Sequence, residues 1–128
     1  VKVQIISKNN NFSIGDQIVT PVEVMHNSLS VMGYRIGGFS YLTDVKYINA
    51  DQMEKVKNSE VLVLNALRIE SHPTHLNLEE ALSLVEELKP KKAYFTHISH
   101  LLGFHDEVSK KLPKNVHLAY DNLQINCN

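Results

Sequence analysis

The 128-residue sequence contains one cysteine, Cys127, and this scarcity excludes an intrachain disulfide framework. A lone cysteine is compatible with a reducing compartment, so we expect a cytoplasmic protein. The sequence also has no apolar run of the length that a membrane span requires. Its first residues, Val1-Lys2-Val3-Gln4, do not have the pattern of a signal peptide. We therefore expect no contact with a membrane.

Neither sign of charge dominates, because 13 basic and 14 acidic residues give a net charge of −1. The basic residues form no stripe, so the sequence gives no support for nucleic acid or an anionic surface as a partner. The hydrophobic content of 43% is sufficient for a core. The length corresponds to one small domain or to part of a larger one. We take residues 1–128 as a single domain, and the absence of an initial Met indicates processing or a piece of a longer chain.

The first third of the sequence has the pattern of an antiparallel meander. Alternating apolar and polar residues predict a strand over 1–7, and one or two further strands over 12–25 with a turn at Gly15-Asp16. Pro21 inside the second segment indicates an edge position or a bulge. Gly37-Gly38, between two short strands, predicts a hairpin.

The remainder alternates between helical and strand patterns. Helices are predicted over 51–57, 77–88 and 104–112, and strands over 60–66, 93–96 and 116–120. Asn49 or Asp51 would cap the first helix, and Asn77 would form a capping box with Glu80 in the second. The predicted fold class is therefore α/β (α+β): a mixed sheet whose antiparallel N-terminal meander is followed by β-α-β units.

Histidine is the residue type in excess, with seven in the chain, and most histidines follow a predicted strand. The residues at strand exits are His26, Asp44, His72, His75, His97, His100 and Asp121. Ligands of α/β sheets bind beyond the carboxyl ends of the strands. Any one of these residues alone is more often an ordinary surface or turn residue, and we assign no role to His105 or His117. Together, imidazole nitrogens and carboxylate oxygens predict a site for Zn, Mn or Fe rather than for Ca or Mg.

An ordered set of short segments also resembles a known family. The segments lie at 19–26, 33–36, 41–44, 65–68, 72–75, 95–100 and 119–121. In this order they are similar to metallo-β-lactamase-fold phosphodiesterases of the ribonuclease Z type, and most of all to the cyclic-phosphate phosphodiesterase that accompanies carbon–phosphorus lyase. The resemblance covers roughly residues 19–125. It implies one half of an αββα sandwich.

The resemblance also implies roles for individual residues. His26 matches a ligand of the first metal, Asp44 the carboxylate that bridges two metals, and His97 a ligand of the second metal. His75 matches a catalytic histidine near the substrate phosphate, which assists the leaving group or holds a phosphoryl oxygen. Residues expected on the substrate side or behind the ligands are Arg68, His72, His100 and Asp121.

One part of the family pattern is missing from this sequence. The His-x-His-x-Asp-His run that supplies most of the remaining ligands in the family is absent. We therefore expect the chain to be the C-terminal half of a longer hydrolase, and a natural half-length protein without catalysis is the alternative. The full-length protein would hold two divalent ions, Zn or Mn, whereas this chain would hold one or none and be inactive. An uncovered apolar sheet face, from strands such as 61–64 and 94–95, would bind the missing half or a second copy.

The implied reaction is hydrolysis of a small phosphodiester by a hydroxide that bridges two metals. Three alternatives remain open at this point. The chain could belong to another hydrolase of the fold, such as a thioester hydrolase or an RNA-processing nuclease, although its neutral charge argues against RNA. It could be a non-catalytic module that binds a metal or a partner. It could also be a structural α/β domain whose histidines are incidental.

Overall fold

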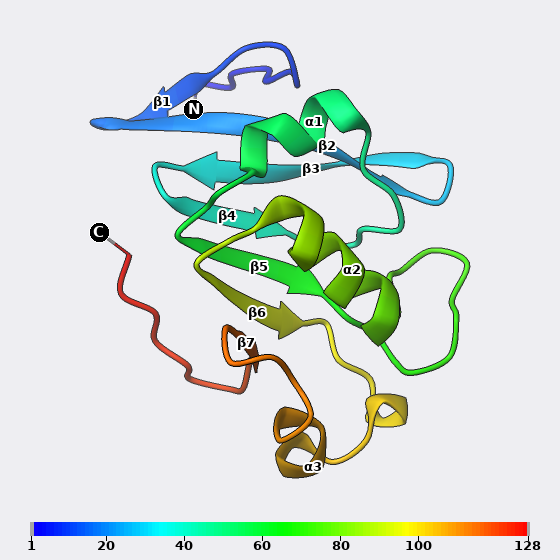
Figure 1. The fold of residues 1–128 in the computed structure, drawn as a ribbon. Coiled ribbons are helices and arrows are strands. Elements are labelled where there is room, and N and C mark those ends of the chain that lie inside the picture. Colours follow the sequence, from blue (N-terminus) through cyan, green and yellow to red (C-terminus); the bar gives the residue numbers. More distant parts are fainter. Residues whose placement is uncertain (1, 128) are drawn as a thin grey trace.

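A computed structural model describes residues 2–127, within which seven strands form one sheet in chain order (Figure 1). The antiparallel part contains β1 (Phe12–Ile14), β2 (Gln17–His26), β3 (Leu29–Ile36) and β4 (Phe39–Leu42). From β4 onward the pairing is parallel, through β5 (Val61–Asn65), β6 (Lys92–Thr96) and β7 (Val116–Leu118). The predicted mixed sheet is therefore confirmed.

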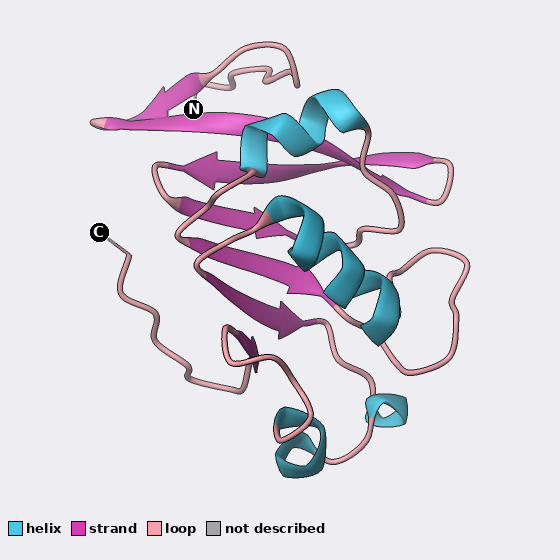
Figure 2. Ribbon diagram, in the orientation of Figure 1, coloured by secondary structure: helices cyan, strands magenta, loops and turns pink. Residues whose placement is uncertain are grey.

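The helices cover one face of this sheet. Figure 2 shows α1 (Ala50–Val56) and α2 (Leu78–Leu88) lying across it, while α3 (His105–Ser109) follows the short 3-10 helix η1 (His100–Leu102) near β7. The core lies between the sheet and the helices, and its fully buried side chains include Val22, Leu42, Leu62, Leu64, Leu88 and Phe95. Complete burial of one such side chain contributes about 1.5–3 kcal/mol, so this layer supplies most of the stability. None of the helices within residues 2–127 is long and apolar enough to cross a membrane.

The predicted turns are present where glycine allows them. Ile36 pairs with Phe39 across the two-residue loop Gly37-Gly38, and Gly37 has a φ of +55°. A Cβ at Gly38 would lie 2.7 Å from the Glu60 side chain, so this position requires the close approach that only glycine permits. The hairpin therefore brings β3 and β4 together beside the start of β5.

Pro21 occupies the edge position that its chemistry requires. Pairing between β1 and β2 ends at Val19, so β2 has no strand neighbour on that side at Pro21 within the described residues. The Pro21 carbonyl accepts a hydrogen bond from Lys55 Nζ at 3.0 Å. In a strand, the backbone carbonyl and nitrogen of one residue point to the same side. The nitrogen of Pro21, which carries no hydrogen, therefore points away from β3, and no hydrogen bond of the sheet is lost.

The clearest helix of the sequence, α2, begins as predicted. Asn77 is its N-cap: the side chain accepts from Glu80 N at 2.8 Å, and the Glu80 carboxylate accepts from Asn77 N at 2.9 Å. This reciprocal pair is a capping box. The predicted apolar stripe of α2 faces the core through Ala81, Val85 and Leu88.

Several boundary predictions are wrong. The strand predicted over 1–7 is irregular from Lys2 to Ser7, with Val3 and Ile5 exposed, because no strand pairs with it within the described residues; Val1 lies outside them. The third helix spans only His105–Ser109, and Phe104, 79% exposed, precedes it in an extended conformation that removes it from the helical stripe. The last strand ends at Leu118 rather than Tyr120. Asn49 is the N-cap of α1, although its side chain makes no capping hydrogen bond.

The opposite face of the sheet carries no helix within the described residues. A groove of about 580 Å³ lies on this open face, between strand residues such as Tyr41, Val63 and Tyr94 and the irregular segment 119–127. Tyr41 is 45% exposed. Side chains alternate along a strand, so Leu62 and Leu64 point into the core while Val63 lines the groove, where it is only 6% exposed. The expectation that strands 61–64 and 94–95 leave an apolar face uncovered is therefore wrong for residues 61–64 and for Phe95, which are buried, while Tyr94 is half-buried.

Glu80 links the capping box to the loop after β4, and this contact predicts a pH dependence of stability. Burial alone would raise the pKa of Glu80, but hydrogen bonds from Lys46 and from Asn77 N outweigh it and hold the pKa below its ordinary value of 4.5. A carboxyl group with a lowered pKa stabilises the fold above its unfolded pKa, and this contribution is lost as the pH falls through the folded value.

We therefore expect Glu80→Gln, which keeps a capping acceptor but removes the charge, to lower the free energy of unfolding at about pH 7 and to have little effect at about pH 3. Urea unfolding of both proteins at the two pH values measures this difference. An equal difference at both would show that the Lys46 ion pair does not contribute.

Candidate metal centre

Four side chains of the predicted site meet at one edge of the sheet. Strands β2, β4, β5 and β6 run in the same direction, so their carboxyl ends share this edge. His26 is the last residue of β2, Asp44 follows β4, His75 lies in the loop between β5 and α2, and His97 follows β6. His75 Nε2 lies 3.2 Å and His97 Nδ1 3.6 Å from Asp44 Oδ1. We refer to these four residues as the His/Asp cluster.

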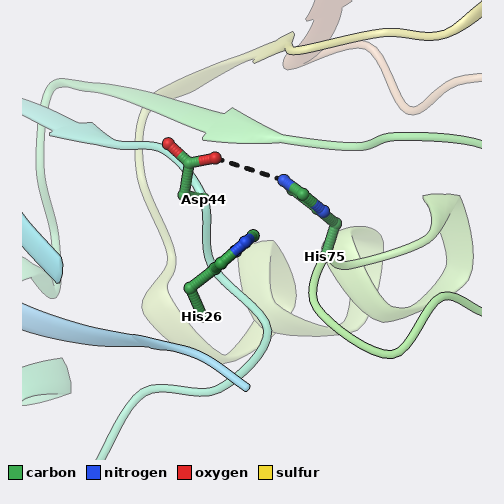
Figure 3. Close-up of side chains that lie close together, drawn as sticks. All are labelled: His26, Asp44 and His75. Carbon is green, nitrogen blue, oxygen red and sulfur yellow. Dashed lines mark hydrogen bonds and ion pairs between the residues drawn. The ribbon is translucent and has the colours of Figure 1, made fainter. Parts of the chain in front are cut away.

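Figure 3 shows how three of these side chains point into a common space. Asp44 and His75 face one another across their hydrogen bond, and His26 approaches from β2. One ligand atom from each of the three lies within 4.8 Å of the others. The His75 ring centroid lies 4.5 Å from that of His26 and 4.6 Å from that of His97.

Backbone hydrogen bonds between the loops hold the cluster together. Met25 O, next to His26, accepts from Lys46 N at 2.8 Å, so β2 is joined to the loop after β4. Leu76 N donates to Val45 O at 2.8 Å, which ties the loop of His75 to the residue after Asp44. Ala66 N donates to Thr96 O at 3.1 Å and thereby fixes the start of the loop that contains His97.

Two residues of the cluster have an unusual backbone conformation. Asp44 has a φ of +59° and His97 a φ of +57°. Side chains other than glycine rarely adopt this left-handed region, although Asp and His tolerate it better than most. Each such residue costs of the order of 1–3 kcal/mol, and such strain concentrates at functional sites. His97 directly follows β6 and Asp44 comes two residues after β4, so the reversal of the chain sets the direction of each side chain.

The electrostatics of the cluster favour a neutral imidazole at His75. Burial lowers the pKa of His75; the hydrogen bond to Asp44 raises it, and the neighbouring His97 and His26 lower it further. Since a carboxylate only accepts, Nε2–H of a neutral His75 donates to Asp44 and Nδ1 carries the lone pair. Thr74 Oγ1 lies 2.9 Å from that Nδ1. His75 is thus oriented from both sides of its ring.

His26 provides the test of whether a metal fits. Its Nδ1 is buried and has no hydrogen-bond partner among residues 2–127. A buried polar atom without a partner costs about 1–3 kcal/mol, so it indicates a ligand that completes the site. Imidazole nitrogens around one carboxylate form the donor set of divalent transition metals. These residues therefore fit a divalent cation.

The other predicted site residues lie around this cluster or apart from it. His72 Nδ1 lies 3.3 Å from Thr74 N and 3.4 Å from His75 Nδ1, so His72 adjoins the cluster. Arg68 donates to the carbonyls of Glu70 and Ser71, so it shapes the loop that carries His72. The exposed residues His100, in η1, and Asp121, in the turn after β7, make no hydrogen bond or ring contact with the cluster among the described residues.

Sequence reasoning gave no role to two residues that support the cluster. Thr74 contacts both His72 and His75 through its hydroxyl, and its place between two histidines was the available signal. Asn65 is fully buried and bonds to the backbone of Val45. A polar residue at the end of the apolar run Val61–Leu64 was the corresponding signal.

Comparison with known proteins identifies the family. Residues 1–98 match the family described as the beta-lactamase superfamily domain. The chain belongs to this superfamily. A solved diphosphatase of the PhnP family is 37% identical to this chain, with a TM-score of 0.92 over 96% of the chain. Human tRNase Z, short form, shares the fold at 16% identity, with a TM-score of 0.67 over 90% of the chain.

A curated relative, an octanoyltransferase of Porphyromonas gingivalis (strain ATCC BAA-308 / W83), is 34% identical over 114 residues, or 88% of the chain. The chain spans 23% of that protein, 48% of the diphosphatase and 45% of the tRNase Z. The resemblance to metallo-β-lactamase-fold hydrolases of the phosphodiesterase type is thus confirmed, as is the α/β fold class.

Replacing the single carboxylate of the cluster tests its role as a ligand. Asn tolerates a positive φ, so we expect Asp44→Asn to keep the fold and the melting temperature of the wild type. Without the negative charge, its affinity for Zn²⁺ should fall by about 100-fold or more. Isothermal titration calorimetry and a thermal melt measure the two quantities. Wild-type affinity in a folded Asp44→Asn variant would remove Asp44 from the ligand set.

Proposed function

We propose that the protein is a metal-dependent hydrolase of small phosphodiesters or phosphoanhydrides, and that this chain supplies part of its centre. The observation that carries the proposal is the His/Asp cluster, in which the buried Nδ1 of His26 has no hydrogen-bond partner among residues 2–127. The PhnP-family diphosphatase supports a phosphate substrate, because 37% identity over 96% of the chain is closer than a shared fold alone.

In this proposal His26, Asp44 and His97 hold divalent metal, Zn²⁺ or Mn²⁺. Bound metal would neutralise phosphoryl oxygens and lower the pKa of water. The remaining ligands of a two-metal site would come from residues outside this chain, and this chain by itself would hold one ion or none. Asp44 suits a position between two ions because its two carboxylate oxygens can each face one of them.

His75 would be the catalytic residue that contacts the substrate. Its Nε2–H points at Asp44, and Thr74 holds Nδ1 on the other side, so the ring is oriented before a substrate arrives. With the ring held there, Nε2–H can be shared with a phosphoryl oxygen beside Asp44. His72 would support this orientation from its place next to Thr74. We give Arg68, His100 and Asp121 only the role of shaping the rim.

The open face would bind the part of the protein that completes the site. The groove on that face is apolar at Tyr41, Val63 and Tyr94. Apolar surfaces of this kind on a protein mark interaction sites. The partner would be the remaining half of a longer hydrolase or a second copy of this chain.

A second candidate function is hydrolysis of an acyl thioester. The observation in its favour is the relative named octanoyltransferase, at 34% identity over 114 residues. Acyl transfer and thioester hydrolysis both proceed by attack on an activated carbonyl, and a divalent metal can polarise that carbonyl. A non-catalytic module that only binds metal is the third possibility.

Activity assays of the whole protein separate these functions. We expect metal-dependent hydrolysis of bis(p-nitrophenyl) phosphate, its loss with a chelator and its recovery with Zn²⁺ or Mn²⁺. His75→Ala should lower kcat by about 100- to 1,000-fold. His105→Ala, an exposed histidine outside the cluster, is the matched control and should keep wild-type kcat. Faster turnover of an octanoyl thioester than of every phosphate substrate would instead favour the second function.

Association through the open face has a separate test. We expect the wild-type protein to associate in sedimentation velocity, and we expect Tyr41→Lys with Tyr94→Lys, which places two charges on the groove, to lose that association. Leu101→Lys, at a side chain that is 50% exposed and does not line the groove, is the control and should associate normally. Unchanged association of the double variant would place the interface elsewhere.

A further inference from the structure

Asn65 is a buried amide at the end of a strand that otherwise consists of apolar residues. It is fully buried, and it ends β5 after Val61–Leu64. Both groups of its amide are used by one neighbour: Oδ1 accepts from Val45 N at 2.7 Å, and Nδ2 donates to Val45 O at 2.9 Å. The side chain therefore pairs with the backbone of Val45 as a neighbouring strand would.

The partner of this amide lies between two residues of the His/Asp cluster. Val45 directly follows Asp44, and its carbonyl also accepts from Leu76 N at 2.8 Å, where Leu76 directly follows His75. Val45 O thus receives one hydrogen bond from Asn65 and one from the loop of His75. Asn65 itself is paired with Thr96, the residue before His97. One side chain therefore lies where the loops of three cluster residues meet.

The backbone conformation of Asp44 explains why the hydrogen bonds between Asn65 and Val45 matter. Parallel pairing of β4 with β5 ends at Leu42, and two residues later the chain reverses with a φ of +59° at Asp44. Beyond that point β5 has no backbone ladder with this segment, and the Asn65 amide takes its place. Two hydrogen bonds in the dry core resist relaxation of the strained turn, because each buried group left unpaired costs about 1–3 kcal/mol.

We propose that Asn65 is a positioning residue that holds Asp44 in its reversed conformation and thereby sets the distances among Asp44, His75 and His97. The role in metal binding rests on the proposed function. A plain structural role is the alternative, in which Asn65 contributes only to folding stability. A second buried polar side chain of the same sheet separates the two.

Ser40 is that matched control. It is fully buried in β4, and its hydroxyl is hydrogen bonded to Ser59 Oγ at 2.8 Å. It precedes Leu42 and Asp44 and makes no hydrogen bond with the cluster among the described residues. Ser40→Ala removes a buried hydrogen bond between β4 and the loop that precedes β5, and Ser40 makes no hydrogen bond with the turn at Asp44 among the described residues.

The test uses Co²⁺ as the probe, since it reports coordination through its visible spectrum. We expect Asn65→Ala to bind Co²⁺ about tenfold more weakly than the wild type and with an altered spectrum, because displaced ligand supports typically cost 10- to 100-fold in affinity. Asn65→Leu has nearly the shape of the native side chain and adds no charge, but it lacks both the donor to Val45 O and the acceptor for Val45 N. We expect weaker binding there also.

Ser40→Ala should lower the melting temperature while the Co²⁺ affinity and spectrum stay at wild-type values. Wild-type Co²⁺ affinity and spectrum in either folded Asn65 variant would overturn the proposal and leave Asn65 a core residue only.

A readout without metal distinguishes failure of this proposal from failure of the proposed function. In the metal-free wild type, the side-chain Nε2–H resonance of His75 reports its hydrogen bond to Asp44. We expect this resonance to shift or vanish in Asn65→Leu and to be unchanged in Ser40→Ala. If the whole protein, with the part that completes the site, binds no Co²⁺, the metal-dependent function is wrong, and the His75 resonance alone decides the role of Asn65. An unshifted resonance would overturn that role.

Discussion

The hydrogen bonds that join four loops at the carboxyl edge of the sheet are the constraint on which the rest of the site depends. His26, Asp44, His75 and His97 lie far apart in the sequence, and no two of them share a strand or helix. Strand direction brings their loops to one edge, but direction alone does not bring side chains within contact. The bonds of Met25, Val45 and Thr96 to their neighbouring loops achieve this.

The His/Asp cluster and the open face of the sheet both bear on whether this chain forms a complete site. The cluster offers three imidazoles and one carboxylate, with a buried His26 Nδ1 that lacks a partner among the described residues. On the open face of the sheet, Tyr41 and Tyr94 line an apolar groove. The chain spans 48% of the solved diphosphatase, and we propose that the remainder of a longer protein completes both the cluster and the groove. The beta-lactamase superfamily provides the fold for a hydrolase, and the phosphate substrate is our proposal.

Much of this arrangement could be predicted from the sequence, because it depends on local patterns. The capping box of Asn77 and the Gly37-Gly38 hairpin follow from short-range chemistry, and strand ends placed His26 and Asp44 at one edge. The remaining features depend on contacts between segments that lie far apart in the sequence. The apolar alternation in residues 2–7 predicts a strand, yet only a neighbouring strand could have made it one. The role of Asn65 depends on Val45, twenty residues away, and no local pattern contains that contact.

Binding of a divalent metal by the His/Asp cluster can be measured by anomalous diffraction from crystals of the whole protein grown with Zn²⁺. We expect a peak inside the cluster, at about 2.0–2.2 Å from an imidazole nitrogen of His26 and from a carboxylate oxygen of Asp44. A fully folded protein with no peak there, or with Zn²⁺ bound only elsewhere, would show that the cluster is not a metal site.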